Sequence, residues 1–237
     1  YAGFFLKEII NVIKNLDEGF GIDRYGEMLA ESSITFEPLF NRLHGPNTIV
    51  DRYIETIALE IIKKEQPGLL GLSVPFPGNV YGALRIGKIV KEKFPDLKIV
   101  MGGGFPNTAL RDLEDTRVFD FIDYILFDDG ERPLLNLIDH IANSTSKSKL
   151  LRTMCREDSR VVTHTDSTDH DIPQSKVGTP TYDGLPWELY LKDTTEANNL
   201  NFLSNISSTS KWNKITLAHG CYWRKCTFCD INHRFII

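Results

Sequence analysis

Residues 69–74 read Leu-Leu-Gly-Leu-Ser-Val, a short apolar run of the kind that a parallel sheet buries on both faces. The run is broken by Pro75, which has no backbone N–H to donate to a sheet. Asn79 is a suitable N-cap for the next element, a helix that we expect from residue 80 to about residue 94, before Pro95. A buried strand followed directly by a helix is typical of the α/β class.

The same alternation continues along the chain. Residues 98–101, Lys-Ile-Val-Met, predict a second strand, and three glycines follow it at 102–104. We expect a short helix near 110–113, a third strand at 123–127, and a helix opened by Gly130 and Pro133. This β-α-β-α-β-α pattern predicts a doubly wound parallel sheet, Rossmann-like or flavodoxin-like, over residues 66–142.

The flanks of this sheet have different patterns. Within residues 1–65 we expect an N-terminal helical extension in which each helix buries one face. Apolar residues recur there at helical spacing in two sets: Phe5, Ile9, Val12, Ile13 and Leu16, and then Val50, Ile54, Ile57, Ile61 and Ile62. Residues 143–210 are rich in Ser, Thr, Lys and Asp and predict a linker or hairpin, with a short strand at 160–163. Residues 211–237 form a last, separate segment.

This last segment contains three closely spaced cysteines, Cys221, Cys226 and Cys229. Three thiolates from one short loop can hold three irons of a 4Fe–4S cluster and leave the fourth iron open for chemistry. They can also form a Cys₃His zinc site with His233, because three residues between Cys229 and His233 is a spacing that zinc ligands use. The segment is therefore a candidate metal site under either interpretation.

The cysteine loop resembles that of the radical S-adenosylmethionine enzymes. Residues 226–229, Cys-Thr-Phe-Cys, match the end of the family pattern, whereas the gap between Cys221 and Cys226 is one residue longer than usual. The subgroup that carries a cobalamin-binding domain in front of its barrel has very similar loops. The resemblance implies a 4Fe–4S cluster on Cys221, Cys226 and Cys229, S-adenosylmethionine at the open iron, and Phe228 against the adenine.

The resemblance also implies a reaction. Enzymes of this family cleave S-adenosylmethionine reductively to a 5′-deoxyadenosyl radical, with an electron from a reductant protein such as flavodoxin or ferredoxin. Methyl transfer is one candidate use of that radical chemistry, on a substrate that the sequence does not identify. Only 16 residues follow Cys221, whereas a full barrel needs on the order of 200. We therefore expect the start of a truncated barrel at residues 211–237, in a fragment of a longer enzyme that is inactive alone.

A second part of the resemblance lies in the sheet. Cobalamin-binding domains often carry Ser-x-Leu and, about one strand-helix unit later, Gly-Gly, with the nucleotide tail of the cofactor between them. Here Ser73-Val74-Pro75 precedes Gly102-Gly103 by 26 residues, and Gly104 extends the glycine run. Glycine at such a turn allows a ligand to approach the backbone closely. These six residues are the candidate cobalamin-binding residues, although a plain strand-to-helix turn would also use such glycines.

Three other features bear on this resemblance. The family's cobalt-ligating histidine loop is absent, because Arg42 stands where its Asp would be and Gly45 follows His44 directly. The resemblance thus implies cobalamin without a protein histidine ligand. Residues 123–131, which end in Gly-Glu, and residues 185–190, Leu-Pro-Trp-Glu-Leu-Tyr, also resemble segments of the family.

Composition excludes several other classes of function. The formal net charge is −5, and the basic residues are scattered, so the chain lacks the basic field that nucleic acids require. Apolar runs are too short to cross a bilayer, so no membrane partner is expected. Cys155 stands alone as an ordinary thiol, and crowding of the other cysteines does not resemble a secreted disulfide framework. We expect a cytoplasmic protein: an enzyme part or, alternatively, a flavodoxin-like binding module with a zinc loop.

Overall fold

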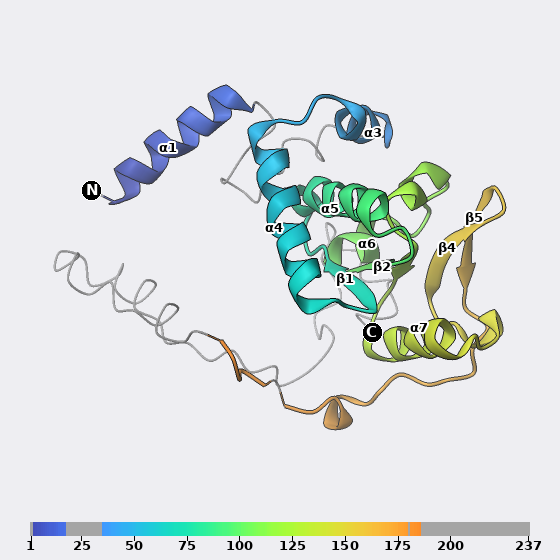
Figure 1. Ribbon diagram of the computed structural model, residues 1–237. Helices are drawn as coiled ribbons and strands as arrows, with labels where there is room; N and C mark the ends of the chain where they lie inside the picture. Colours follow the sequence, from blue (N-terminus) through green and yellow to red (C-terminus); the bar gives the residue numbers. More distant parts are fainter. Residues whose placement is uncertain (1, 18–34, 180, 186–237) are drawn as a thin grey trace, which may run out of the picture. The chain divides into compact units, whose positions relative to one another are not determined.

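The computed structural model describes residues 2–17, 35–179 and 181–185 (Figure 1). The chain divides into two compact units, residues 1–172 and residues 173–237. The described sheet and both described hydrophobic cores belong to the first unit. In the second unit, the described part contains the short 3₁₀ helix η5 (Gln174–Lys176).

The first unit is built on a five-stranded sheet with the strand order β1-β2-β3-β4-β5. The strands are β1 (Leu69–Ser73), β2 (Lys98–Gly102), β3 (Tyr124–Leu126), β4 (Thr153–Glu157) and β5 (Arg160–His164). β1, β2 and β3 are parallel, whereas β4 pairs antiparallel with β3 and β5 antiparallel with β4. The parallel strands require crossovers, and helical segments between them supply these.

Helices cover both faces of this sheet (Figure 1). Helix α5 (Val80–Lys93) packs on one face and α7 (Glu131–Asn143) on the other. Since successive side chains of a strand point to opposite faces, Ile99 and Met101 of β2 join the core under α5, and Val100 joins the core under α7. This layered arrangement confirms the α/β, Rossmann-like fold class expected from the sequence.

Three described helices precede the sheet: α1 (Ala2–Leu16), α3 (Glu37–His44) and α4 (Ile49–Glu65). Helix α4 begins with a capping box, in which the Thr48 hydroxyl accepts the Asp51 N–H and the Asp51 carboxylate accepts the Thr48 N–H. These bonds satisfy backbone groups that would otherwise lack a partner in the first turn.

Helices α4 and α5 lie side by side (Figure 1). Ala58 and Ile62 of α4 are buried, whereas Ile57 and Ile61 are exposed. The apolar spacing in this segment predicted one buried face that included residues 57 and 61. That expectation is wrong for these two side chains, because the buried stripe of α4 is narrower than its apolar stripe. It is also wrong for α1, on which Phe5, Ile9, Val12 and Leu16 are exposed.

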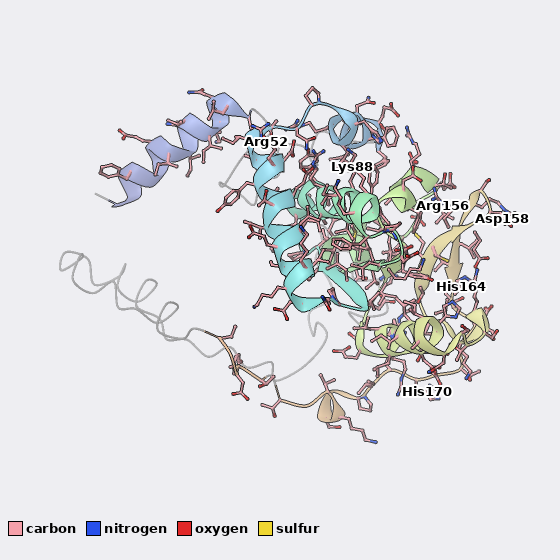
Figure 2. All side chains as sticks on the ribbon, in the orientation of Figure 1. Arg52, Lys88, Arg156, Asp158, His164 and His170 are labelled. Carbon is pink, nitrogen blue, oxygen red and sulfur yellow. The ribbon has the colours of Figure 1, made fainter. Side chains whose placement is uncertain are left out.

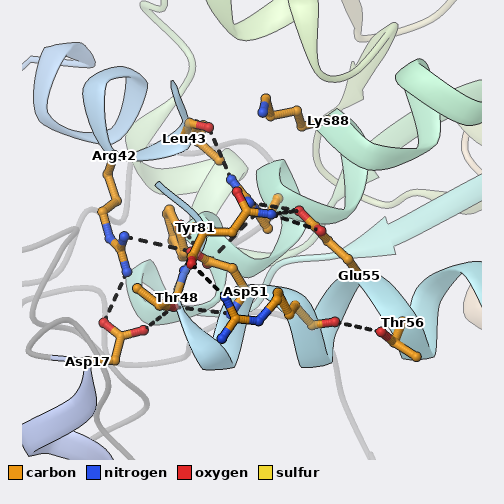
Figure 3. A network of polar contacts seen from close by, with 12 residues as sticks. Asp17, Arg42, Leu43, Thr48, Asp51, Glu55, Thr56, Tyr81 and Lys88 are labelled. Atoms are coloured by element: carbon orange, nitrogen blue, oxygen red, sulfur yellow. Dashed lines mark hydrogen bonds and ion pairs between the residues drawn. The ribbon is translucent and has the colours of Figure 1, made fainter. Parts of the chain in front are cut away.

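A buried polar network joins α3, α4 and α5 (Figure 3). Arg85 of α5 is fully buried, and its Nη1 donates to the Leu43 carbonyl at 3.0 Å. Its Nη2 lies 2.8 Å from Glu55 Oε1, and its Nε lies 3.9 Å from Asp51 Oδ1. The guanidinium thus meets two carboxylates of α4, which offset the cost of burying its charge.

The network extends to the end of α1 (Figure 3). Arg42 Nη2 lies 3.0 Å from Asp17 Oδ1, and the Thr48 hydroxyl donates to Asp17 Oδ2 at 2.5 Å. The Tyr81 hydroxyl donates to Asp51 Oδ1 at 2.7 Å. Together these contacts connect Asp17, α3 and α4 to α5.

Several elements begin or end differently from the sequence prediction. Helix α6 (Gly104–Ala109) starts inside the glycine run, and residues 110–113 follow it as a turn. Asn79 does not cap α5 with its side chain, because it belongs to the 3₁₀ turn η2 (Pro77–Asn79). β1 is only partly buried rather than buried on both faces, because it is the edge strand of the described sheet.

The hairpin of β4 and β5 lies within residues 143–210, the range that the sequence indicated as a linker or hairpin. It extends the sheet beyond β3, and Met154 of β4 is part of the core under α5. Among the described residues, none of the helices is both long and apolar enough to cross a bilayer.

Candidate functional site

The carboxyl ends of β1, β2 and β3 meet at one edge of the sheet, and a pocket of about 430 Å³ opens there. It is lined by Gly71, Leu72, Ser73, Val100, Gly102, Gly103, Leu126, Asp128, Gly130, Glu131 and Leu134. Glu131 and Leu134 belong to α7, so the pocket lies on the α7 side of the sheet. Open α/β sheets bind ligands beyond the carboxyl ends of their strands, which makes this pocket the candidate binding site.

The floor of the pocket consists of strand residues with little or no side chain. Gly71, Ser73 and Gly102 follow one another across β1 and β2, because Ser73 pairs with Gly102 and lies two residues after Gly71. A Cβ atom added to Gly71 would meet no atom within 4 Å, and one added to Gly102 would meet only Leu126 O, at 3.8 Å. The pocket therefore exists because these positions lack bulk, and a larger side chain at residue 71 would fill it.

The next two glycines have a different role. Gly103 has φ +112°, and a Cβ there would lie 2.7 Å from Val74 O; a Cβ on Gly104 would lie 2.8 Å from Pro75 O. The two loops are also hydrogen-bonded, since Val74 N–H donates to Gly102 O at 2.7 Å and Val74 O accepts from Phe105 N–H at 3.0 Å. These glycines are required for the close approach of the β1 and β2 loops.

The third loop of the pocket is held by Asp128. Its backbone N–H donates to Asn107 Oδ1 at 2.7 Å, which stabilises its left-handed conformation with φ 64°. Its carboxylate pairs with Arg111, which follows α6, and lies 3.4 Å from Arg152 Nε. Arg152 Nη2 also donates to Asp129 O at 3.1 Å. The two guanidinium groups offset the charge of Asp128 and fix the mouth of the pocket.

The predicted cofactor-binding residues divide into two groups. Ser73, Gly102 and Gly103 line the pocket. The other three do not line it: Val74 is fully buried in the core, and Pro75 and Gly104 contact one another in the loop packing.

The predicted metal ligands Cys221, Cys226 and Cys229 lie outside the described residues, as do Phe228 and the alternative zinc ligand His233. Their arrangement stays a prediction from the sequence. The expected barrel strand at residues 214–218 lies outside the described residues as well.

Sequence reasoning missed part of the pocket. Gly71 belongs to an apolar run in the sequence, but a glycine inside a strand can also mark a position where a ligand comes close to the sheet. Arg111 and Arg152 had no signal, because they lie 17 and 24 residues from Asp128 in the chain and meet it only in the fold. Asp128 and Glu131 lie within residues 123–131, the segment whose sequence resembles one of the family.

No protein-family model matches the sequence, and no curated protein matches it. Among solved structures, the chain is similar to the radical S-adenosylmethionine methyltransferase TsrM from Kitasatospora setae, determined with a tryptophan substrate and a S-adenosylmethionine analogue. The TM-score is 0.39, with 18% sequence identity over 47% of this chain. The matched part spans 21% of that enzyme's length.

Proposed function

We propose that this chain is the N-terminal part of a radical S-adenosylmethionine enzyme with a cobalamin-binding-like domain. In this proposal the cysteine loop at residues 221–229 holds a 4Fe–4S cluster and the sheet pocket receives the nucleotide tail of cobalamin. The observation that carries the proposal is the coincidence of two signals: the pocket floor of Gly71, Ser73 and Gly102, and the cysteine triad that follows in the same chain.

The pocket residues suit the nucleotide tail of cobalamin. Its walls include Val100, Leu126 and Leu134, which are apolar and suit an aromatic base, and the Ser73 hydroxyl can donate to a ribose or phosphate oxygen. The bare backbone at Gly71 and Gly102 leaves room for a flat ring against the sheet. Cobalamin, when bound, would supply a cobalt that can carry a methyl group.

The cysteine loop would supply the radical chemistry. Cys221, Cys226 and Cys229 provide thiolates for three irons, and Phe228 would pack on the adenine of S-adenosylmethionine, as the family pattern implies. A reductant protein such as flavodoxin or ferredoxin would supply the electron for cleavage, and methyl transfer is the reaction class that unites the two cofactors. The substrate would be bound mainly by parts of the enzyme beyond this chain.

Titration with hydroxocobalamin tests the sheet pocket. We expect a change in the cobalamin spectrum and co-elution on gel filtration with the unmodified chain, and loss of both with Gly71→Val, because the valine would occupy the pocket floor. Valine is favoured in strands, so the variant should keep its fold. Gly68→Val is the matched control, since residue 68 is exposed, lies outside the pocket and has open space around its Cβ.

Two results would contradict the pocket assignment: no binding by the unmodified chain, or equal binding by Gly71→Val. The cluster is tested separately, by anaerobic reconstitution of the full-length enzyme with iron and sulfide. A broad absorption in the blue region of the visible spectrum and reductive cleavage of S-adenosylmethionine are expected, and both should be lost in Cys226→Ala. A full-length enzyme that assembles no iron–sulfur centre would overturn the catalytic proposal.

The alternative function is a non-catalytic binding module with a Cys₃His zinc site. It is favoured by His233, whose spacing from Cys229 suits a zinc ligand. Metal analysis would support it if one zinc per chain were bound in the cysteine loop and were lost in both Cys226→Ala and His233→Ala.

A further inference from the structure

Three side chains of metal-ligating type face one another on the β4–β5 hairpin. Cys155 and Glu157 lie two residues apart on β4, and His164 ends β5 (Figure 2). In the hairpin register Cys155 pairs with Val162, and His164 with Thr153. Residues two apart on one strand share a face, so Thr153, Cys155 and Glu157 point to the same side of the sheet. Directly paired residues also share a face, so His164, the partner of Thr153, lies on that side as well.

The potential ligand atoms are already close together. The Cys155 Sγ, a Glu157 carboxylate oxygen and a His164 ring nitrogen all lie within 4.8 Å of one another. Glu157 Oε1 is 3.0 Å from His164 Nε2. Tetrahedral zinc with bonds of about 2.0–2.3 Å places its ligand atoms roughly 3–4 Å apart. Small side-chain rotations would bring the three atoms to that spacing.

The surroundings suit an ion that enters from solvent. Cys155 is buried at the base of the cluster, whereas the side chains of Glu157 and His164 are 28% and 13% exposed. A soft thiolate combined with an imidazole favours zinc over magnesium or calcium, which prefer oxygen ligands. Three protein ligands leave a fourth zinc position for water.

We propose that Cys155, Glu157 and His164 bind one zinc ion at the antiparallel edge of the sheet, with the fourth position open to water. In the structure, the Lys147 ammonium lies 2.6 Å from Glu157 Oε1 and competes for the carboxylate that zinc would use. Lys147 is 53% exposed on a flexible stem, so it can turn into solvent when the ion binds. The cluster shares no residue with the sheet pocket, and it is independent of the proposed function.

Cobalt(II) titration of the full chain tests this site, because a thiolate ligand gives cobalt a near-ultraviolet charge-transfer band. Cys221, Cys226 and Cys229 are first replaced by Ser, so that Cys155 is the remaining thiol. We expect one cobalt per chain with a thiolate band, displaced by one equivalent of zinc. Cys155→Ser should abolish the band, and Glu157→Gln and His164→Gln should each raise the Kd for cobalt at least about tenfold, the lower end of what even outer-shell changes cost.

The controls separate ligation from folding. His170→Gln and Glu92→Gln remove the same chemical groups outside the cluster and should leave the Kd unchanged. Lys147→Met should lower the Kd, because it removes the competing cation, an effect that a purely structural ion pair would not produce. Absence of a thiolate band in a folded chain, or equal weakening by the two controls, would overturn the proposal. The variant background lacks Cys221, Cys226 and Cys229, the proposed iron–sulfur ligands. A negative result for zinc at Cys155 therefore does not test the proposed radical enzyme.

Discussion

Arg85 is a fully buried cation. Single residues of its polar network determine how strongly the N-terminal helices are held against α5 and the sheet. Burial of an ion is costly unless charged partners and hydrogen bonds surround it. Arg85 has Glu55 and Asp51 as charged partners and the Leu43 carbonyl as an acceptor (Figure 3). Removal of the cation alone would take from Glu55 and Asp51 their shared charged partner, although Asp51 keeps its contacts with Tyr81 and Arg42.

We therefore predict that Arg85→Met lowers the free energy of unfolding by about 3 kcal/mol, the scale measured when one member of a buried ion pair is removed. Arg52→Met is the matched control, because Arg52 is exposed and its contact is a hydrogen bond to the Asn47 carbonyl (Figure 2). Its effect should stay within about 0.5 kcal/mol. Urea denaturation at neutral pH measures both. A similar loss in the two variants would contradict the role of the buried network.

The same network makes the stability pH-dependent through Asp51. Burial alone would raise the pKa of Asp51, but the Thr48 N–H, the Tyr81 hydroxyl and the charges of Arg85 and Arg42 together hold that pKa below its ordinary value. A carboxyl whose folded pKa is depressed stabilises the fold above its unfolded pKa and loses that contribution as the pH falls through its folded pKa.

The predicted result is a stability difference between the unmodified chain and Asp51→Asn that is constant from pH 7 to about pH 5 and shrinks below the unfolded pKa of roughly 3.9. Denaturation curves at several pH values measure it. Asp158→Asn, at the exposed turn of the β4–β5 hairpin, is the control (Figure 2). Its free energy of unfolding should change with pH in the same way as that of the unmodified chain. A constant difference down to pH 2.5 would show that the Asp51 charge has no part in stability.

At the scale of elements, α5 has two glycines with opposite surroundings. A Cβ on Gly82 would meet no atom within 4 Å, whereas a Cβ on Gly87 would lie 2.3 Å from Phe121 O. Phe121 is the C-cap of the 3₁₀ helix η3 (Thr116–Asp120), so Gly87 is what allows α5 and the end of η3 to approach so closely. Gly82 has no such packing role and only weakens the helix.

This contrast gives a matched pair of substitutions in one helix. Gly82→Ala should raise the free energy of unfolding by roughly 0.5–1 kcal/mol, because alanine loses less backbone entropy than glycine on folding. Gly87→Ala should lower it by about 1–3 kcal/mol, because the methyl group collides with backbone that cannot rotate away. Thermal denaturation followed by circular dichroism distinguishes them. If both substitutions changed the free energy of unfolding in the same direction, the approach of α5 to η3 would not be tight.

At the scale of the whole molecule, the described interactions that stabilise the fold lie in the first of the two units. All five described strands and both described cores lie before residue 173. Hydrophobic burial is the main favourable term in folding, so the unit of residues 1–172 contains the interactions needed for a cooperative fold.

We predict that a chain cut after Ile172 unfolds at a Tm within about 3 °C of the full chain, which corresponds to less than roughly 1 kcal/mol for a protein of this size. A chain cut after Leu150 should unfold at a clearly lower Tm. It lacks β4 and β5, so the edge of β3 is exposed, and the hydrophobic core loses Met154. Scanning calorimetry on both truncations measures this. A large loss of Tm on removal of residues 173–237 would contradict the independence of the first unit.

The sequence alone determined the positions of the three parallel strands, of α5 and α7, and the presence of the cysteine triad. These are local properties: apolar runs, helical spacing, and breaks at Pro and Gly can each be read within a window of a few residues. The strand at residues 153–157 was not predicted, because it is paired through contacts with β3 and β5 and lies in a polar stretch.

Only the tertiary structure decided which residues share a site. Gly71, Ser73 and Gly102 form one floor because β1 and β2 pair in register, and Asp128 meets Arg111 and Arg152 because three loops converge at one edge. The split between pocket glycines and packing glycines likewise depends on what a Cβ atom would touch. Such facts arise from distances between segments far apart in the chain, and no local pattern of residues encodes those distances.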